Sequence, residues 1–238
     1  MKGDFLLFTL EGFKNTFAYM DMFLEGVVTT VSLSALTVLF GFVLALMLAL
    51  MRMSKVKVLR GFATAYVELF RATPMLVQIL LIYNVVLGPV AIPHYKLFGF
   101  IRFERFLPGV IALSMNSGAY LSEIIRSGIQ SIDLGQTEAS RSLGMNAVQT
   151  MRYIILPQAI KNILPAIANE FVTIIKESSI CWIVGVQEIM GAVNSIKAAT
   201  YSIGEPLIVA TAIYFCLTFP TSKIIEHFER KMSRGDKR

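Results

Sequence analysis

Charged residues are scarce in this sequence. Only 16% of its 238 residues are charged, against about 25% in water-soluble domains, while 55% are hydrophobic and the mean hydropathy is +0.64. This balance excludes an ordinary soluble domain and predicts an integral membrane protein. The net charge is +6, but the basic residues flank apolar runs. Attraction to anionic lipid head groups therefore explains that charge better than binding to nucleic acid.

Groups that carry chemistry are also few. The two cysteines, Cys181 and Cys216, lie in apolar surroundings without pairing spacing, which argues against a disulfide framework or a metal site. The two histidines, His94 and His227, are far apart in the sequence. The phosphate-binding pattern G-x-x-x-x-G-K-[ST], the zinc pattern H-E-x-x-H and the nucleophile pattern G-x-S-x-G are all missing. We therefore expect no catalytic residue, metal or cofactor on this chain, which is not predicted to be an enzyme.

Long apolar runs are what the sequence does contain. A membrane span needs about 20 mostly apolar residues, and five stretches qualify, at about 26–51, 67–90, 107–129, 160–186 and 206–225. The expected fold is all-α, a polytopic membrane protein with five transmembrane helices. There is no repeat and no sign of a second domain, so residues 1–238 are expected to form a single domain. The aromatic and basic segment 91–106 predicts an interfacial helix.

Lys and Arg placement predicts the orientation, because these residues are retained on the cytoplasmic side. With the N-terminus outside, fourteen fall inside and six fall outside. The inside group is Arg52, Lys55, Lys57, Arg60, Arg126, Arg141, Arg152, Lys161, Lys223, Arg230, Lys231, Arg234, Lys237 and Arg238. The outside group is Lys2, Lys14, Lys96, Arg102, Arg105 and Lys197. We therefore predict an external N-terminus, a cytoplasmic C-terminus and a cytoplasmic loop at 130–159.

That loop has helix signals of its own. Asp133 with Gln136 three residues later fits a helix N-cap, and Gly144 suits the position after a helix end. Asn146 with Gln149 repeats the capping pattern, and a second helix should run toward Pro157. The pattern predicts two short helices joined by a glycine turn. From the residues alone, the segment is either an ordinary connection or a surface for another protein.

The spacing within this loop resembles the EAA loop of ABC importer permeases, E-A-A-x3-G-x9-I-x-L-P. Its counterparts here are Glu138, Ala139, Ser140, Gly144, Ile154, Leu156 and Pro157, with Ser140 in place of the third alanine. The stretches YVELFRATPMLVQILLIY, GAYLSEIIRSGIQSIDLGQTEASRSLG and LPQAIKNILPAIANEFVTIIKESSI are similar to the polar amino acid uptake branch, of the histidine, glutamine and arginine type. Together with GVVTTVSLS, the resemblance covers roughly residues 20–230.

The resemblance implies the permease subunit of an ATP-driven importer in a bacterial cytoplasmic membrane. Such a permease pairs with a second copy or a paralogue, with cytoplasmic ATPases that bind ATP and Mg²⁺, and with an extracytoplasmic solute-binding protein. The EAA helix would seat in a groove on the ATPase. The cargo implied is an amino acid, and the residues leave open whether it is basic, amide or acidic.

Polar residues at membrane depth are the other informative group, because burying them in lipid without partners costs several kcal/mol. In the third span Asn116, Tyr120, Glu123 and Ser127 form one helical stripe. The fourth span is interrupted by a polar group that includes adjacent opposite charges at Lys176 and Glu177. We expect a substrate path bordered by Asn116, Ser117, Tyr120, Glu123, Glu170, Thr173, Lys176, Glu177 and Ser178.

Other interpretations of these polar residues stay open. Each could instead serve as a hydrogen-bonding contact between spans. Arg71 with Glu68, near the inner end of the second span, predicts a structural ion pair at i, i+3 at the level of the lipid head groups. A transporter or channel that does not use ATP is a second function class, disfavoured by the EAA spacing and by the lack of inverted repeats. An intramembrane enzyme using Glu123 and Glu177 is a third, although no metal or nucleophile set accompanies them.

Overall fold

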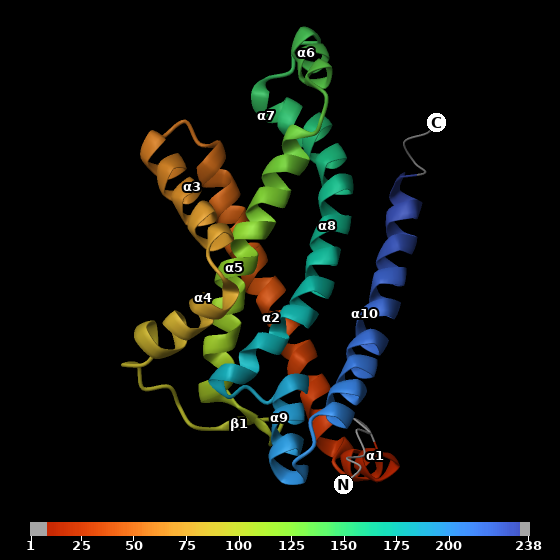
Figure 1. The fold of residues 1–238 in the computed structure, drawn as a ribbon. Helices are drawn as coiled ribbons and strands as arrows, with labels where there is room; N and C mark the ends of the chain where they lie inside the picture. The colour runs from red at the N-terminus through yellow and green to blue at the C-terminus, as the bar shows by residue number, and fades with distance from the viewer. Residues whose placement is uncertain (1–8, 234–238) are drawn as a thin grey trace. The chain divides into compact units, whose positions relative to one another are not determined.

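The computed structural model describes residues 9–233, and helices make up most of them. Figure 1 labels the elements in chain order. They are α1 (Leu10–Phe17), α2 (Met20–Met53), α3 (Lys57–Ala72), α4 (Met75–Leu81), the π-helical turn η1 (Ile82–Val86), β1 (Lys96–Leu97), β2 (Ile101–Arg102), α5 (Phe103–Gln130), α6 (Leu134–Ser142), α7 (Ala147–Thr150), the π-helical turn η2 (Met151–Ile155), α8 (Leu156–Glu177), the 3₁₀ helix η3 (Ser178–Val184), α9 (Ile189–Thr200) and α10 (Gly204–Ser233). The prediction of a helical chain is confirmed.

The fold divides into two compact units, each drawing on several parts of the chain. The first unit holds the described residues up to Thr37, together with Met75–Leu113 and Thr173–Pro220. The second holds Val38–Pro74, Ser114–Val172 and the described residues from Thr221 onward. Helices α2, α5, α8 and α10 each contribute residues to both units.

The core of the first unit brings the N-terminal part of α2 against α9 and the start of α10. Its buried members are Phe23, Ile189, Ala192, Val193, Ile196, Val209 and Ala210. Gly26 lets α2 approach the start of α9 closely, since a Cβ atom there would lie 3.0 Å from the backbone nitrogen of Ile189. A residue without a side chain is therefore required at this helix crossing.

Small residues also set the packing of the second unit. One cluster joins α2, α5 and α8 through Ala45, Ala49, Leu121, Ile125, Ala159 and Ile163. Gly118 faces Leu44, and Gly128 faces Ile163 so closely that a Cβ atom would overlap that side chain. Small residues at helix crossings let backbones approach and gain van der Waals contact, which drives helix association in membranes.

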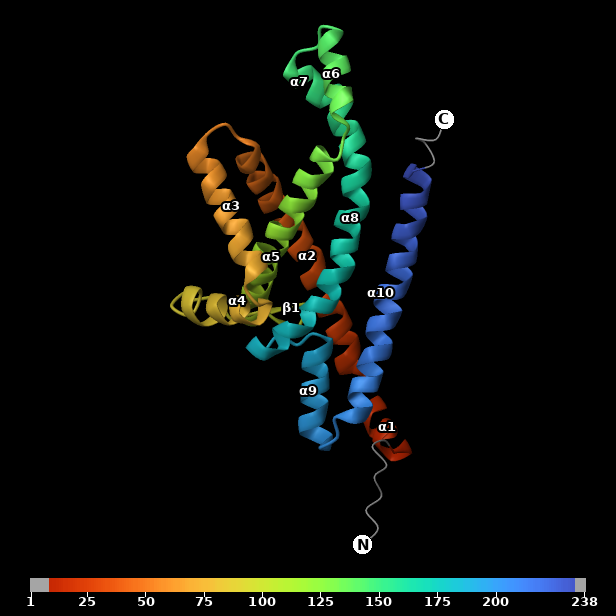
Figure 2. The same cartoon turned by 45° about the horizontal axis from the view of Figure 1, so that its top comes forward.

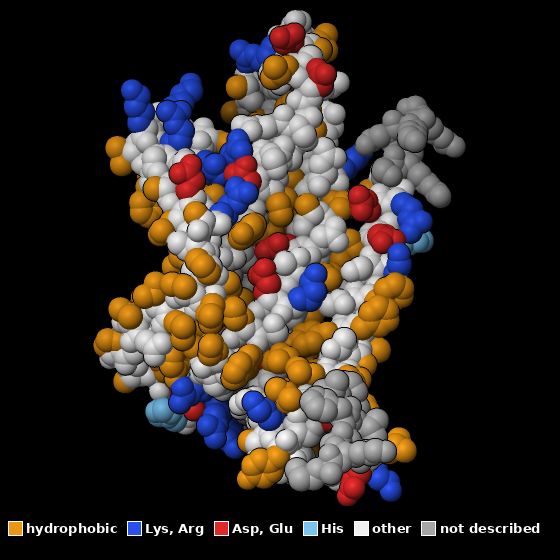
Figure 3. Space-filling model, in the orientation of Figure 1, with side chains coloured by type: hydrophobic (Ala, Val, Ile, Leu, Met, Phe, Trp, Pro, Cys, Tyr) orange, Lys and Arg blue, Asp and Glu red, His pale blue; other side chains and the backbone are white. Residues whose placement is uncertain are grey.

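The outward faces of the helices are apolar, as expected for a chain in lipid. Large hydrophobic side chains that are more than half exposed include Leu39, Phe40, Val43, Met47 and Leu50 on α2 and Phe62 and Leu69 on α3. Lys and Arg side chains gather over the turn between α2 and α3 (Figure 3), where the sequence places Arg52, Lys55, Lys57 and Arg60. Lys2, Arg234, Lys237 and Arg238, which also entered the orientation argument, lie outside the described residues.

The spans differ from the prediction in detail. Among the described residues, α2 and α10 alone are long and apolar enough to cross a membrane as single helices, and two further pairs of helices pass the same test together across a break. The count of five spans therefore stays a prediction, as does the single domain over residues 1–238. The predicted third span, 107–129, lies within α5.

The predicted second span, 67–90, is interrupted in the structure. Helix α3 ends at Ala72 and α4 begins at Met75, after Thr73 and Pro74. The residue before a proline is pushed away from the helical region, and Thr73 has ψ 146°. The predicted fourth span ends its α-helix at Glu177 and continues as η3.

The prediction of an interfacial helix within 91–106 is wrong for most of that segment. Residues 96–102 form a two-stranded antiparallel hairpin in which Lys96 pairs with Arg102 and Leu97 with Ile101. Phe98 and Gly99 at its turn both have positive φ. Helix begins only at Phe103, the first residue of α5.

Candidate functional site

The polar loop of the second unit folds as a short helical hairpin, α6 and α7, between α5 and α8 (Figure 2). The N-cap predicted at Asp133 is confirmed, since its side chain accepts a hydrogen bond from the Gly135 nitrogen at 2.6 Å. Asn146 and Gln149 form a complete capping box, with hydrogen bonds of 2.8 and 2.9 Å. The two short helices that the sequence predicted are therefore present.

Gly144 occupies the turn between these helices. Its φ is +87°, in the left-handed region that favours glycine, and a Cβ atom there would meet nothing within 4 Å. The requirement for glycine thus comes from the backbone conformation and not from crowding.

Ser140 does not lie on the surface of the hairpin. Its side chain is 3% exposed, and its hydroxyl lies 3.0 Å from that of Thr150 at the end of α7. It also donates to the carbonyl of Thr137. In this structure Ser140 holds α6 to α7, while its neighbours Glu138 and Ala139 are exposed.

Three large apolar side chains are exposed on the surface of the hairpin. Leu134 is 77% exposed, Leu143 84% and Val148 73%. The sequence analysis did not select them, although their position beside the capping residues was a usable signal. Exposed apolar side chains on an otherwise polar hairpin are typical of a protein-binding surface.

The end of the motif lies where the hairpin joins α8. Ile154 is in η2, and Leu156 and Pro157 begin α8. Pro157 has no N–H to donate to the preceding turn, and the chain passes this point as a π-helical turn. The Gln158 side chain donates to the Ile154 carbonyl at 2.7 Å, which gives that oxygen a partner.

The polar stripe predicted on the third span also lies in the second unit, where it meets α3 and α8. Asn116 donates from Nδ2 to the carbonyl of Phe70 at 3.3 Å. The Ser117 hydroxyl donates to Oε1 of Glu170 at 3.1 Å. Ser127 bonds the Ile124 carbonyl of its own helix. These contacts join α5 to the C-terminal end of α3 and to α8.

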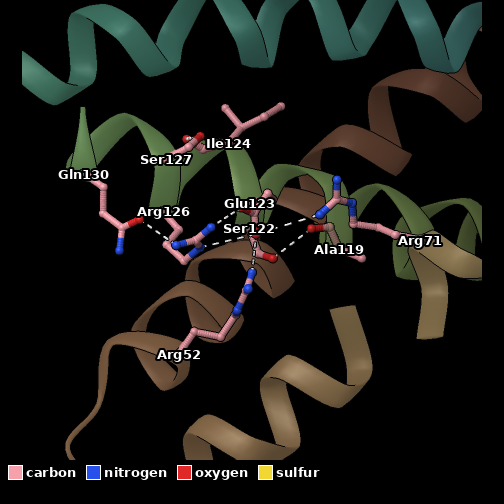
Figure 4. Close-up of polar contacts among 9 residues, drawn as sticks. All are labelled: Arg52, Arg71, Ala119, Ser122, Glu123, Ile124, Arg126, Ser127 and Gln130. Carbon is pink, nitrogen blue, oxygen red and sulfur yellow. Dashed lines mark hydrogen bonds and ion pairs between the residues drawn. The ribbon is translucent and has the colours of Figure 1, made fainter. Parts of the chain in front are cut away.

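Glu123 is the centre of a charged cluster on the same stripe (Figure 4). Its carboxylate accepts hydrogen bonds from Arg126, one turn along α5, and from Arg52 in the last turn of α2. Nη1 of Arg71, in the last turn of α3, lies 3.9 Å from the same carboxylate.

The expected ion pair between Arg71 and Glu68 is wrong. Glu68 is exposed, and among the described residues the ion-pair partner of Arg71 is Glu123. The Arg71 guanidinium also lies over the ring of Tyr120, 5.5 Å from its centre. The tertiary fold thus draws Arg71 to the α5 stripe and away from its own helix.

Lys176 and Glu177 border a cavity of about 600 Å³ in the first unit. Its other lining residues are Met75, Ser179, Ile180, Trp182, Met190 and Tyr214. Among the described residues, neither charge has an ion-pair partner within 4.0 Å, although the two attract each other along the chain. Ser178 is fully buried and donates to the Ile175 carbonyl, and it is not among the residues that line this cavity. Thr173 is half-buried.

A second acid, bonded to a residue that lines this cavity, escaped the sequence analysis. Glu188 is fully buried at the N-cap of α9, where its carboxyl group accepts from the backbone nitrogens of Met190 and Gly191. The hydroxyl of Tyr214, which lines the cavity, donates to it at 2.8 Å. Helix-capping spacing was a usable signal, but nothing local to Glu188 indicates the contact with Tyr214, which lies 26 residues away.

This chain is similar to known proteins over most of its length. The family model described as "Binding-protein-dependent transport system inner membrane component" matches residues 26–234. The chain is 41% identical over 208 residues to a putative glutamine transport system permease protein, GlnP, of Rickettsia bellii, covering 87% of this chain and 91% of that protein. It is 38% identical over 224 residues to the arginine transport system permease protein ArtQ of Bacillus subtilis, covering 94% and 98%.

Solved structures show the same likeness. A crystal structure of an amino acid ABC transporter with histidines has a chain that is 44% identical, with a TM-score of 0.84 and coverage of 92% of this chain and 98% of that one. A structure of the MetNI methionine ABC transporter in an inward-facing conformation has a TM-score of 0.65 over 87% of this chain and 96% of that one. At 18% identity the latter supports the fold alone.

Proposed function

Since this chain belongs to the family of inner membrane components of binding-protein-dependent transport systems, we propose that it is the permease subunit of an ATP-driven amino acid importer. The observation that carries this proposal is the hairpin α6–α7, a capped element that exposes Leu134, Leu143 and Val148. An apolar surface on a polar cytoplasmic element requires a soluble partner. That partner is the ATPase, which binds ATP and Mg²⁺ and hydrolyses the nucleotide.

The amino acid cargo is supported by the relatives and by the charges of the chain. The relatives named above are permeases for glutamine and arginine transport. An amino acid carries an ammonium and a carboxylate group, and the cavity bordered by Lys176 and Glu177 offers a charge opposite to each. The other residues proposed to border the path are Asn116, Ser117, Tyr120, Glu123 and Glu170, which belong to the second unit, and Thr173 and Ser178, which belong to the first.

The complete importer contains two permease subunits, two ATPases and an extracytoplasmic solute-binding protein. The N-terminus faces outside and the C-terminus faces the cytoplasm, because the Lys and Arg residues then lie predominantly inside. Glu138, Ala139 and Gly144 belong to the face of the hairpin that meets the ATPase, while Ser140 supports that face from within. Ile154, Leu156 and Pro157 set the angle at which the hairpin joins α8.

The test of this function is reconstitution. The permease is co-expressed with its ATPase, placed in proteoliposomes with ATP inside, and supplied with the solute-binding protein and radiolabelled glutamine, arginine, histidine and glutamate. ATP-dependent accumulation of at least one of these amino acids is expected. Uptake that persists without ATP, or no accumulation of any amino acid by a complex that hydrolyses ATP, would contradict the proposal.

The docking surface is tested separately with Leu143→Asp. Burying an unpaired carboxylate in place of an apolar anchor should weaken ATPase binding by at least about 2 kcal/mol, roughly thirtyfold in Kd. Washed membranes should then lose the ATPase while the permease stays inserted. Leu10→Asp, at a residue that is 90% exposed on α1, is the matched control and should retain the ATPase.

A further inference from the structure

Positive charge exceeds negative charge in the cluster around Glu123. Three guanidinium groups, from Arg52, Arg71 and Arg126, meet a single carboxylate within 4.0 Å (Figure 4). Arg52 and Arg126 donate hydrogen bonds to that carboxylate, and Arg126 also bonds Gln130 at 2.6 Å. Glu123 is therefore neutralised without Arg71, and the Arg71 charge is in excess.

Arg71 is also the most open of the three arginines. Its side chain is 45% exposed, compared with 13% for Arg52 and 28% for Arg126. Within the described part of the chain it makes no hydrogen bond, only the 3.9 Å ion pair and the contact with the Tyr120 ring. The ring supports one face of the guanidinium and leaves its five N–H donors at the edge available.

The position of Arg71 on α3 turns its side chain away from the apolar face of that helix. The exposed apolar residues Phe62 and Leu69 mark the opposite face, because nine and two residues turn a helix by about 180° and 200°. Arg71 therefore lies on the polar face of α3, toward the cluster around Glu123.

From this geometry we propose that Arg71 binds the carboxylate group of the amino acid that passes through the permease. A guanidinium matches a carboxylate with two parallel hydrogen bonds, a geometry that lysine does not reproduce. When Arg71 turns to the substrate, Glu123 stays hydrogen-bonded to Arg52 and Arg126, so its charge keeps its partners. Tyr120 would then be the platform that orients the guanidinium. This inference rests on the proposed function and names Arg71 as a substrate-binding residue of that path.

The experiment uses the reconstituted complex of permease, ATPase and solute-binding protein described above, with the amino acid that the wild-type complex accumulates. Uptake and stimulated ATP hydrolysis are measured in the same vesicles for Arg71→Gln. We expect uptake to fall roughly tenfold or more, the factor that about 1.4 kcal/mol represents. Stimulated ATP hydrolysis should stay within about twofold of the wild type, since the hairpin α6–α7 is unchanged. Arg60→Gln, an equal charge change at an exposed position of the same helix, should leave both unaltered.

A chemical rescue separates substrate binding from a structural role. Arg71→Cys is made with Cys216→Ser, which removes the exposed native thiol, while Cys181 is buried. Treatment with 2-aminoethyl methanethiosulfonate attaches a positive charge and should restore part of the uptake. The sulfonatoethyl reagent attaches a negative charge and should not.

Three results would overturn the assignment. The first is unchanged uptake in Arg71→Gln, and the second is equal recovery with both reagents. The third is a loss of uptake and ATP hydrolysis together with a lowered unfolding temperature in both Arg71→Gln and Arg71→Lys, which would make Arg71 a structural partner of Glu123. The wild-type complex would still transport in all three cases, so the proposed function would stand.

Discussion

The contact between Glu188 and Tyr214 leads to a quantitative prediction about the first unit. The Glu188 carboxyl group is 0% exposed and accepts three hydrogen bonds, from Met190 N at 3.0 Å, Gly191 N at 2.8 Å and the Tyr214 hydroxyl at 2.8 Å. It therefore caps α9 and fixes α10 to it at the same time. Removing either partner should destabilise the protein.

The size of each effect depends on which polar groups lose a hydrogen-bond partner in the variant. Tyr214→Phe removes only the hydroxyl and leaves a buried acceptor short of one partner, at a cost of about 1–3 kcal/mol. Glu188→Ala removes the helix cap, worth about 1–2 kcal/mol, and leaves the Tyr214 hydroxyl without its acceptor, so we expect roughly 3 kcal/mol in total. Because the two side chains bond each other, the double variant should cost about 1 kcal/mol less than the sum.

The assay is thermal unfolding of the purified permease–ATPase complex in detergent. At ~2–4 °C per kcal/mol for a chain of this size, Glu188→Ala should lower the midpoint by roughly 6–12 °C and Tyr214→Phe by roughly 2–12 °C. Glu25→Ala, at an exposed glutamate of α2 in the same unit, is the control and should leave the midpoint unchanged. Midpoints within about 1 °C of the wild type for both variants, or strictly additive effects, would refute the reasoning.

Other predictions concern the hairpin, the orientation and the cavity. Gly144→Asp should uncouple transport by forcing a side chain into the left-handed region and adding charge at the docking surface, whereas the near-isosteric Gly144→Asn adds no charge and should lose less ATPase from washed membranes; equal losses would argue against a contribution from the charge. A cysteine at position 197 should react with an impermeant reagent added from outside and one at position 55 should not, and the reverse pattern would overturn the topology. Lys176→Met and Glu177→Gln should each change the apparent affinity for the amino acid while the ATPase stays bound; heat-labile variants with unchanged affinity would assign these residues to helix packing.

Several features of this fold follow from local sequence alone. The caps at Asp133 and Asn146 and the glycine turn at Gly144 were predicted correctly, because capping depends on residues three or four positions apart. Pro74 was the signal for the interruption after Thr73, but the prediction of a single span over 67–90 did not take it into account. Apolar composition favoured one continuous span and the proline favoured a break, and the prediction gave more weight to the composition.

Contacts between distant segments could not be predicted in this way. Arg71 has Glu68 one turn away, yet it lies against Glu123, 52 positions along the chain. Ser140, at the centre of the loop motif, is buried against Thr150, so one residue of the predicted docking set supports the surface instead of forming it. Spacing shows which residues share a face of one helix, but it does not show which helix that face meets.

Local sequence patterns are enough to predict a helical membrane protein with a capped polar hairpin, because hydropathy, capping and glycine requirements are properties of neighbouring residues. Tertiary structure decided the partners of its buried charges. Glu188 meets Tyr214, and Glu123 gathers Arg52, Arg71 and Arg126, only because α2, α3, α5, α9 and α10 pack as they do. A charge away from water needs a partner wherever the fold supplies one, and that partner can come from any part of the chain.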